Sequence, residues 1–160
     1  MIPYEEISNN ANLFLVVLGG RTRGSHIELH DVRWVIGKKV EDTFDQLKEQ
    51  WFGDINGLHI DSYMKVNFID GYMIVIKRNS KGDNIPSNFP TKRISEGPSL
   101  WFVNIGGYES NSLSEKHKFG LVVANSRKEA SKKAKSKWLI DIDKKHKDDI
   151  SSLAKIKSID

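Results

Sequence analysis

The sequence predicts an α+β fold made of two tandem β-β-α-β-β repeats related by a pseudo-twofold axis, with mainly antiparallel sheets and the helices on one face. Three observations predict it. Residues 13–61 align without a gap on residues 100–148. Each copy opens with a short apolar run that ends in Gly-Gly, as a buried strand running into a turn does. The Asp70-Gly71 pair, between two apolar stretches, is a strong hairpin signal.

The internal match is well above chance. About 14 of about 49 aligned pairs are identical, against roughly three expected for an ordinary composition. A gapless match at that level indicates a duplication. Two copies are too few for a solenoid, so the sequence predicts a pair of similar halves in one compact domain.

The first repeat, residues 13–78, yields its elements in order. Leu13–Leu18 predicts a buried strand, and residues 27–36 a second, extended one. Residues 41–52 predict a helix because Phe44, Leu47 and Trp51 recur at helical spacing, with Gly53 as its stop. Residues 59–68 predict another strand, which leads into a hairpin of strands 64–69 and 72–76.

The second repeat, residues 100–160, is partly eroded. Residues 100–105 and 119–123 predict strands, and residues 126–138 predict a helix whose thin apolar face includes Trp138. Ser126 and Glu129 have capping-box spacing, in which Ser126 accepts from the Glu129 amide and Glu129 reaches back. Residues 1–12 are expected to be a flexible arm, and the Pro-, Ser- and Asn-rich residues 79–99 a linker.

Composition excludes several classes of protein. The chain of 160 residues has no cysteine, which rules out disulfides, thiolate catalysis and cysteine-based metal sites. The opening apolar run is too short to span a bilayer and lacks a basic leader. We therefore expect a cytoplasmic protein, with no cofactor and no membrane partner.

Charge is distributed unevenly along the chain. Residues 1–90 carry 10 Lys and Arg against 12 Asp and Glu, and residues 91–160 carry 15 against 9. The basic second half could attract nucleic acid. No aromatic residues are interleaved there for base stacking, so a solvated helix face is the favoured interpretation.

Four of the five histidines occupy repeat-paired positions. Each copy contains Glu-x-His and, further on, His-x-Asp; the residues are Glu28, His30, His59 and Asp61, and Glu115, His117, His146 and Asp148. Residues two apart on a strand share a face, so the four groups of one copy converge if their strands are neighbours.

Three interpretations of this pattern stay open. A carboxylate–imidazole set could bind a divalent metal, although its spacing matches no compact ligand signature. It could perform acid–base catalysis, with Arg33 and Arg23 holding an anion. It could also be structural and satisfy backbone groups, which is the default where no geometric site is demonstrated.

The loop after the first strand offers a separate candidate. Its two glycines and the Arg21 and Arg23 side chains could bind an anion, yet the second copy lacks both arginines and no helix follows directly. A turn is the favoured role. Asp31 and Arg33 also have no counterpart in the second copy, so the first repeat carries the richer polar set.

Several strings resemble a known family. These are Leu18-Gly-Gly, Ile27-Glu-Leu-His-Asp-Val-Arg-Trp-Val-Ile-Gly, Gln50-Trp-Phe-Gly and Leu58-His-Ile-Asp-Ser-Tyr. They are similar to a small bacterial family described only as a domain of unknown function, closely over residues 13–76 and loosely in the second copy. The resemblance implies a bacterial cytosolic protein and brings no activity, cofactor or partner.

We expect a non-enzymatic binding or regulatory module. Its ligand-facing residues would be Glu28, His30, Asp31, Arg33, His59 and Asp61. The alternatives are a small, metal-assisted hydrolase that uses the same residues, and weak nucleic-acid binding through the basic half. A small ligand, a protein partner or a second copy in a homodimer are all compatible with the sequence.

Overall fold

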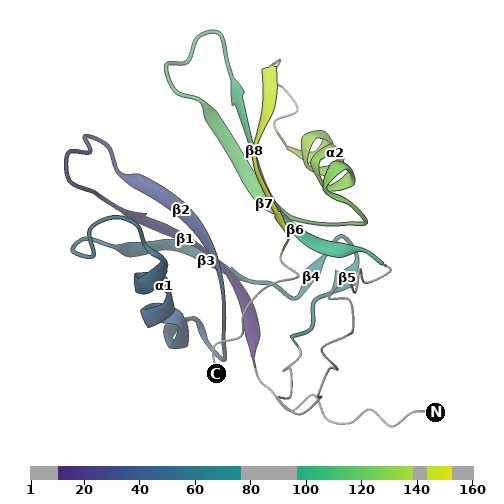
Figure 1. Cartoon of the computed structure of the whole chain (residues 1–160), viewed down its shortest axis with the longest axis horizontal. Coiled ribbons are helices and arrows are strands. Elements are labelled where there is room, and N and C mark those ends of the chain that lie inside the picture. Colours follow the sequence, from purple (N-terminus) through teal and green to yellow (C-terminus); the bar gives the residue numbers. More distant parts are fainter. Residues whose placement is uncertain (1–10, 77–96, 139–143, 153–160) are drawn as a thin grey trace, which may run out of the picture. The chain divides into compact units, whose positions relative to one another are not determined.

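In the residues that it describes, the computed structural model contains mainly antiparallel sheets and two short helices (Figure 1). It describes residues 11–76, 97–138 and 144–152, and within the last range the side chains of Ile150 and Ser151 only. The chain divides into two compact units, one holding β1 to β3 with their helix and the other holding β6 to β8 with theirs. The α+β class predicted from the sequence is confirmed.

The first unit is a three-stranded sheet in the order β2-β1-β3. Its strands are β1 (Asn12–Gly20), β2 (Leu29–Gly37) and β3 (His59–Lys65), and both pairings are antiparallel. Between β2 and β3 the chain forms a 3-10 turn, η1 (Val40–Thr43), and the helix α1 (Phe44–Gln50). The second unit repeats this pattern.

The second sheet has the order β7-β6-β8. Its elements are β6 (Ser99–Tyr108), β7 (Lys116–Ala124), α2 (Arg127–Lys137) and β8 (Lys144–Ser152), and its pairings are also antiparallel. The equivalent strand orders agree with the duplication seen in the sequence. The predicted arm and linker lie outside the described residues except at their ends, where Asn12 begins β1 and Ser99 begins β6.

Each unit has its own core on the helix side of its sheet. In the first, alternate β1 residues such as Val16 and Leu18 pack with Leu47 and Trp51 of the helix segment. In the second, Val103 and Ile105 of β6 pack with Ala130 and Ala134 of α2. No helix in the described ranges is long and apolar enough to cross a bilayer.

The apolar stripe of the first helix differs from the predicted one. Phe44 is 42% exposed, whereas Val40, Thr43 and Leu47 are buried. The chain begins to coil at Val40 as a 3-10 turn, so Thr43 takes the inward position and donates its hydroxyl to the Val40 carbonyl at 2.6 Å. Burial of Leu47 and Trp51 agrees with the prediction.

The predicted hairpin forms, but it is shorter and stands apart from the main sheet. β4 (Phe68–Ile69) and β5 (Tyr72–Met73) form a separate two-stranded sheet. Asp70 and Gly71 both have positive φ, as a type I′ turn requires. The long predicted strand breaks after Lys65 because Val66 turns inward, is buried and donates to the Leu13 carbonyl.

The second helix has the predicted N-cap with one difference. Ser126 accepts from the Glu129 amide at 3.2 Å. Glu129 reaches back one residue further than predicted, to the backbone and side-chain amides of Asn125. The predicted final hairpin of the second repeat lies outside the described residues.

Candidate functional site

The repeated polar residues of the first copy meet at one end of its sheet. Gly19 of β1 lies directly opposite His30 of β2 on one side and His59 of β3 on the other. Residues opposite one another in a sheet point to the same face, so both imidazoles share the face on which a Gly19 side chain would stand. Glu28 comes just before β2, and Asp61 lies two residues after His59.

A β-bulge sets the position of Asp61. Val17 pairs with Ser62 and Leu18 pairs with Ile60, so Asp61 is the extra residue of β3 and has no partner on β1. A bulge changes the direction of a side chain and leaves one residue of the strand without a backbone partner. Bulges are frequent beside functional sites. Here the bulge coincides with one of the repeated polar residues.

The four side chains form a closed ring of alternating imidazoles and carboxylates. His30 Nε2 lies 3.5 Å from Glu28 Oε2 and 3.3 Å from Asp61 Oδ2. His59 Nε2 lies 3.4 Å from Glu28 Oε1 and 3.1 Å from Asp61 Oδ1. Each carboxylate therefore bridges both imidazoles. We call Glu28, His30, His59 and Asp61 the His–carboxylate ring.

Gly19 provides the space for this ring. A Cβ atom at position 19 would lie 2.7 Å from His59 Nε2 and 3.0 Å from both Asp61 carboxylate oxygens. Real Cβ contacts are not that short, so the ring can rest on β1 only where no side chain is present. Sequence reasoning missed this role, although the Gly-Gly pair repeated in both copies was a signal for it.

The His59 ring has a defined tautomer. Its Nδ1 lies 2.9 Å from the carbonyl oxygen of Gly57. A carbonyl can only accept, so Nδ1 carries a proton and Nε2 faces the two carboxylates. The hydrogen bond to Gly57, together with the Glu28 and Asp61 charges, raises the pKa of His59 above its ordinary value, against an opposing effect of desolvation.

The ring is open to solvent. The side chains of His30, His59, Glu28 and Asp61 are 53%, 47%, 40% and 32% exposed. Ion pairs this exposed contribute little to folding. Their exposure does not suggest a packing role, whereas the bond from His59 to the Gly57 carbonyl is a contact of the kind that the structural interpretation predicts.

The second unit places the equivalent residues at equivalent backbone positions. Gly106 lies opposite His117 of β7 and His146 of β8, just as Gly19 lies opposite His30 and His59. Asn104 pairs with Asp149 and Ile105 with Lys147, so Asp148 is the bulge residue there. His117 Nε2 lies 3.5 Å from Glu115 Oε2, the same separation as in the first unit.

Two of the predicted ligand-facing residues lie elsewhere. Asp31 and Arg33 are opposite Leu18 and Val16, on the helix side of the sheet. They form an ion pair at 2.6 Å, and Arg33 donates to the Gln50 carbonyl at the end of α1 at 3.0 Å. The structure therefore does not bring them into the ring. Arg21 and Arg23 are exposed in the loop between β1 and β2.

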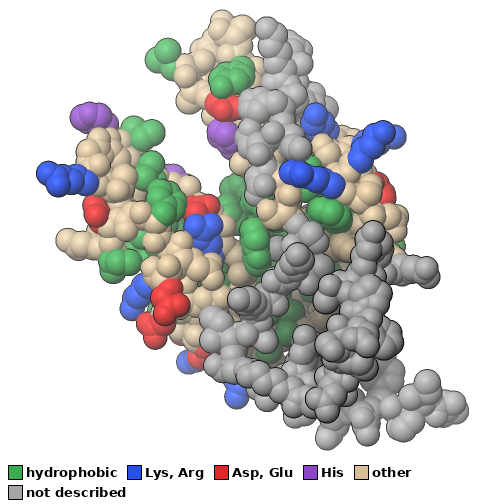
Figure 2. All heavy atoms as spheres, viewed as in Figure 1, with side chains coloured by type: hydrophobic (Ala, Val, Ile, Leu, Met, Phe, Trp, Pro, Cys, Tyr) green, Lys and Arg blue, Asp and Glu red, His purple; other side chains and the backbone are tan. Residues whose placement is uncertain are grey.

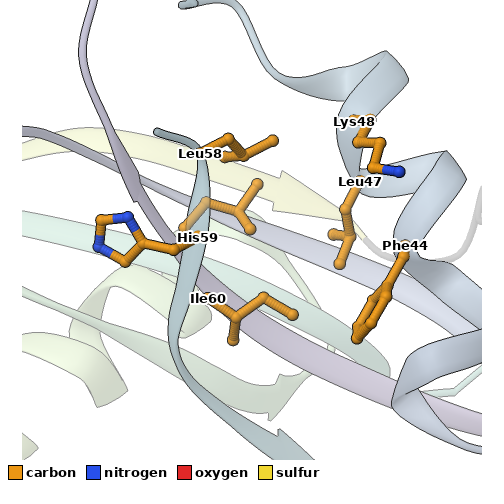
Figure 3. A pocket seen from close by; sticks show the side chains of 7 residues that line it. Phe44, Leu47, Lys48, Leu58, His59 and Ile60 are labelled. Carbon is orange, nitrogen blue, oxygen red and sulfur yellow. The ribbon is translucent and has the colours of Figure 1, made fainter. Parts of the chain in front are cut away.

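An apolar pocket of about 250 Å³ lies on the helix side of the first sheet. Leu58, Ile60, Leu47 and Phe44 converge in it between β3 and α1 (Figure 3). Figure 3 shows the His59 ring projecting away from these side chains, on the other side of the strand. His59 is one of the residues that line the pocket, but its imidazole projects to the opposite face of β3.

Basic residues gather on the exposed side of α2, where Arg127, Lys128, Lys132, Lys135 and Lys137 are exposed (Figure 2). A shallow hollow there is lined by Arg127, Lys128, Ser131, Lys132, Lys135 and Ile150. This agrees with a solvated helix face, and its charge would suit a polyanion.

Comparison with known proteins identifies the family. The family described as "Domain of Unknown Function (DUF1543)" matches residues 25–76 and 112–160. The chain belongs to the DUF1543 family. Each matched region contains one complete Glu-x-His and His-x-Asp set, so the DUF1543 match is itself duplicated in step with the internal repeat.

The chain is similar over most of its length to a protein of known structure. Protein Il1583 from Idiomarina loihiensis is 32% identical and superposes with a TM-score of 0.62, covering 89% of this chain and 77% of that protein. No curated protein of established function matches. The DUF1543 assignment thus supports the fold and the duplication and indicates no activity.

Proposed function

We propose that this DUF1543 chain is a binding module whose ligand is a cation and that the His–carboxylate ring of the first unit is its binding site. The observation that carries the proposal is the approach of both imidazole Nε2 atoms to the same two carboxylates at 3.1–3.5 Å. The cysteine-free composition supports a reducing compartment, and we place the protein in the bacterial cytosol.

The charge balance of the ring favours a bound cation. With Nδ1 of His59 protonated by its bond to Gly57, a neutral imidazole would turn its Nε2 lone pair toward two carboxylate oxygens. A lone pair facing two anionic oxygens at this distance is repulsive. The ring is therefore stable only when it holds positive charge, either as a proton on Nε2 or as a bound cation.

The ring is also accessible from solvent. The ring faces solvent, so a cation can enter it without any opening of the fold. The core on the other face of the sheet is formed by other residues, so the ring is not needed for packing. Polar residues that are exposed, convergent and dispensable for the core are those expected to bind a ligand.

A titration of the full-length protein tests the proposal. The probes are two panels at constant ionic strength, one of divalent metal chlorides and one of organic cations such as putrescine and agmatine, with KCl as the reference. The readout is the ¹⁵N signals of the His30 and His59 imidazoles. We expect at least one probe to shift both signals in the native chain and neither in Glu28→Gln/Asp61→Asn. If no probe of either panel shifts them beyond the KCl reference, the proposed function is wrong.

A further inference from the structure

We propose that the cation bound by the His–carboxylate ring is a divalent first-row transition metal ion, with the two imidazole Nε2 atoms and one oxygen from each carboxylate as its ligands. This inference rests on the proposed function and names its ligand class. Three features of the ring carry it.

The donor set is the first feature. Imidazole nitrogens and carboxylate oxygens together suit zinc and its neighbours, whereas calcium and magnesium prefer oxygen donors alone. The ring offers two of each, from Glu28, His30, His59 and Asp61. An organic ammonium group would need only carboxylates, so the two imidazoles would serve no purpose toward it.

The spacing of the donors is the second feature. Four ligands bound tetrahedrally to zinc at about 2.0–2.1 Å lie about 3.3–3.4 Å from one another. The four nitrogen–oxygen separations around the ring are 3.1, 3.3, 3.4 and 3.5 Å. Each Nε2 atom therefore lies at about the donor–donor distance of a four-coordinate site from one oxygen of each carboxylate, and the two imidazoles face different oxygens of the same carboxylates.

The outer contact of His59 is the third feature. Metal-binding histidines usually donate their second ring N–H to a carboxylate or a backbone carbonyl, which fixes the tautomer and the ring orientation. The Nδ1 of His59 makes this contact with Gly57, and its Nε2 is left for the ring. Gly57 itself has a positive φ of 91°, a conformation that glycine adopts without strain.

Binding requires the side chains of the ring to rearrange. As they stand, no group of three or more His, Asp or Glu side chains in the described ranges is placed to hold a metal ion. Each carboxylate now turns different oxygens to the two imidazoles, and a rotation would present one oxygen to both neighbours. The four side chains are exposed enough to rotate without disturbing the core.

Metal uptake by the full-length, EDTA-stripped protein tests the inference. CoCl₂ and ZnCl₂ are added in turn. Cobalt reports four-coordinate binding through its visible absorption, and the His30 and His59 ¹⁵N imidazole signals report whether the ion sits in this ring. We expect both imidazoles to bind through Nε2, and Asp61→Asn to weaken zinc affinity by about 100-fold or more.

Two matched controls accompany the measurement. His26→Ala removes an exposed loop histidine outside the ring, and Asp45→Asn removes an exposed carboxylate from α1. Both should bind zinc as the native chain does, and thermal unfolding should show that Asp61→Asn is folded. Unchanged zinc affinity in a folded Asp61→Asn, or no zinc effect on the His59 signals, would overturn the inference. If the organic cations bind at the ring and the metals do not, the inference fails while the proposed function stands.

Discussion

Gly19 and His59 are in contact across two neighbouring strands in a way that only glycine permits. A Cβ atom on Gly19 would lie 2.7 Å from His59 Nε2, the atom that faces both carboxylates of the ring. The next glycine has a different partner: a Cβ atom on Gly20 would lie 2.7 Å from Cζ2 of Trp51. The Gly-Gly pair therefore serves the ring on one face of the sheet and the core on the other.

The two glycines predict opposite outcomes for the same substitution. In Gly19→Ala the new methyl group displaces the ends of His59 and Asp61, which can move into solvent. We expect stability to change by no more than about 0.5 kcal/mol, as for other surface positions, and zinc affinity to fall at least 10-fold. Thermal unfolding and zinc titration measure the two effects.

Gly20→Ala is the matched control. Its methyl group meets the buried Trp51 ring, so we expect a loss of roughly 1–3 kcal/mol from overpacking. The ring residues are on the other face, and zinc affinity of the folded fraction should be retained. Equal loss of zinc affinity in both variants would contradict the division of roles.

Leu47 and Phe44 give a second pair of contrasting substitutions, on one helix. Leu47 is 2% exposed within the core of the first unit, and Phe44 is 42% exposed at the pocket rim. We expect Leu47→Ala to cost about 2–5 kcal/mol because it leaves a cavity, and Phe44→Ala to cost clearly less. Denaturant unfolding followed by tryptophan fluorescence measures both, and a larger loss in Phe44→Ala would be inconsistent with the observed stripe.

Much of this arrangement could be predicted from local sequence. Strand β1, the hairpin turn and the α2 cap are set by short-range signals, namely an apolar run, an Asp-Gly pair and a Ser-x-x-Glu spacing. The internal repeat also singles out all four residues of the ring. The strand, the turn and the cap depend on residues close together in the chain, and the repeat is visible by comparing the chain with itself.

The remainder depends on register between strands. Successive residues of β2 point to opposite faces of the sheet, so Asp31 and Arg33 lie on the other face from His30. The predicted ligand surface combined residues from both faces. The bulge at Asp61 arises from pairing with β1, which no single strand encodes. The equivalent tryptophans also differ: Trp51 packs on Gly20 of β1, and Trp138 packs on Gly120 of β7.

Asp70 makes a long-range contact that the turn sequence could not reveal. Its carboxylate accepts from the Val123 amide at 2.9 Å and from the Lys137 ammonium group. Partial burial acts to raise the pKa of Asp70, but the bonds from Lys137 and Val123 and the charges of Lys137 and Lys133 outweigh it and lower the pKa. The folded state therefore favours the ionised carboxylate.

This shift predicts the pH dependence of stability. A carboxyl with a lowered folded-state pKa adds stability above its unfolded value of 3.8, and that stability is lost as the pH falls through the folded value. Asp70→Asn keeps the positive φ accessible and should cost roughly 1–2 kcal/mol at pH 7 through weaker hydrogen bonds. The difference in unfolding free energy between Asp70→Asn and the native chain should become smaller below pH 3.8. A difference that stays constant down to pH 2 would rule out the ionised Asp70 carboxylate as its source.

The N-cap of α2 provides the last prediction. Ser126 Oγ accepts from the Glu129 amide, one of the amides at the start of a helix that lack a partner within it. Ser126→Ala removes this acceptor and should cost about 1 kcal/mol, whereas Ser126→Asp keeps it and should cost little. Ser131→Ala, on the same helix, is the control for propensity alone. Thermal unfolding of the three variants measures the difference, and a Ser126→Ala midpoint equal to that of Ser131→Ala would show that the cap contributes nothing.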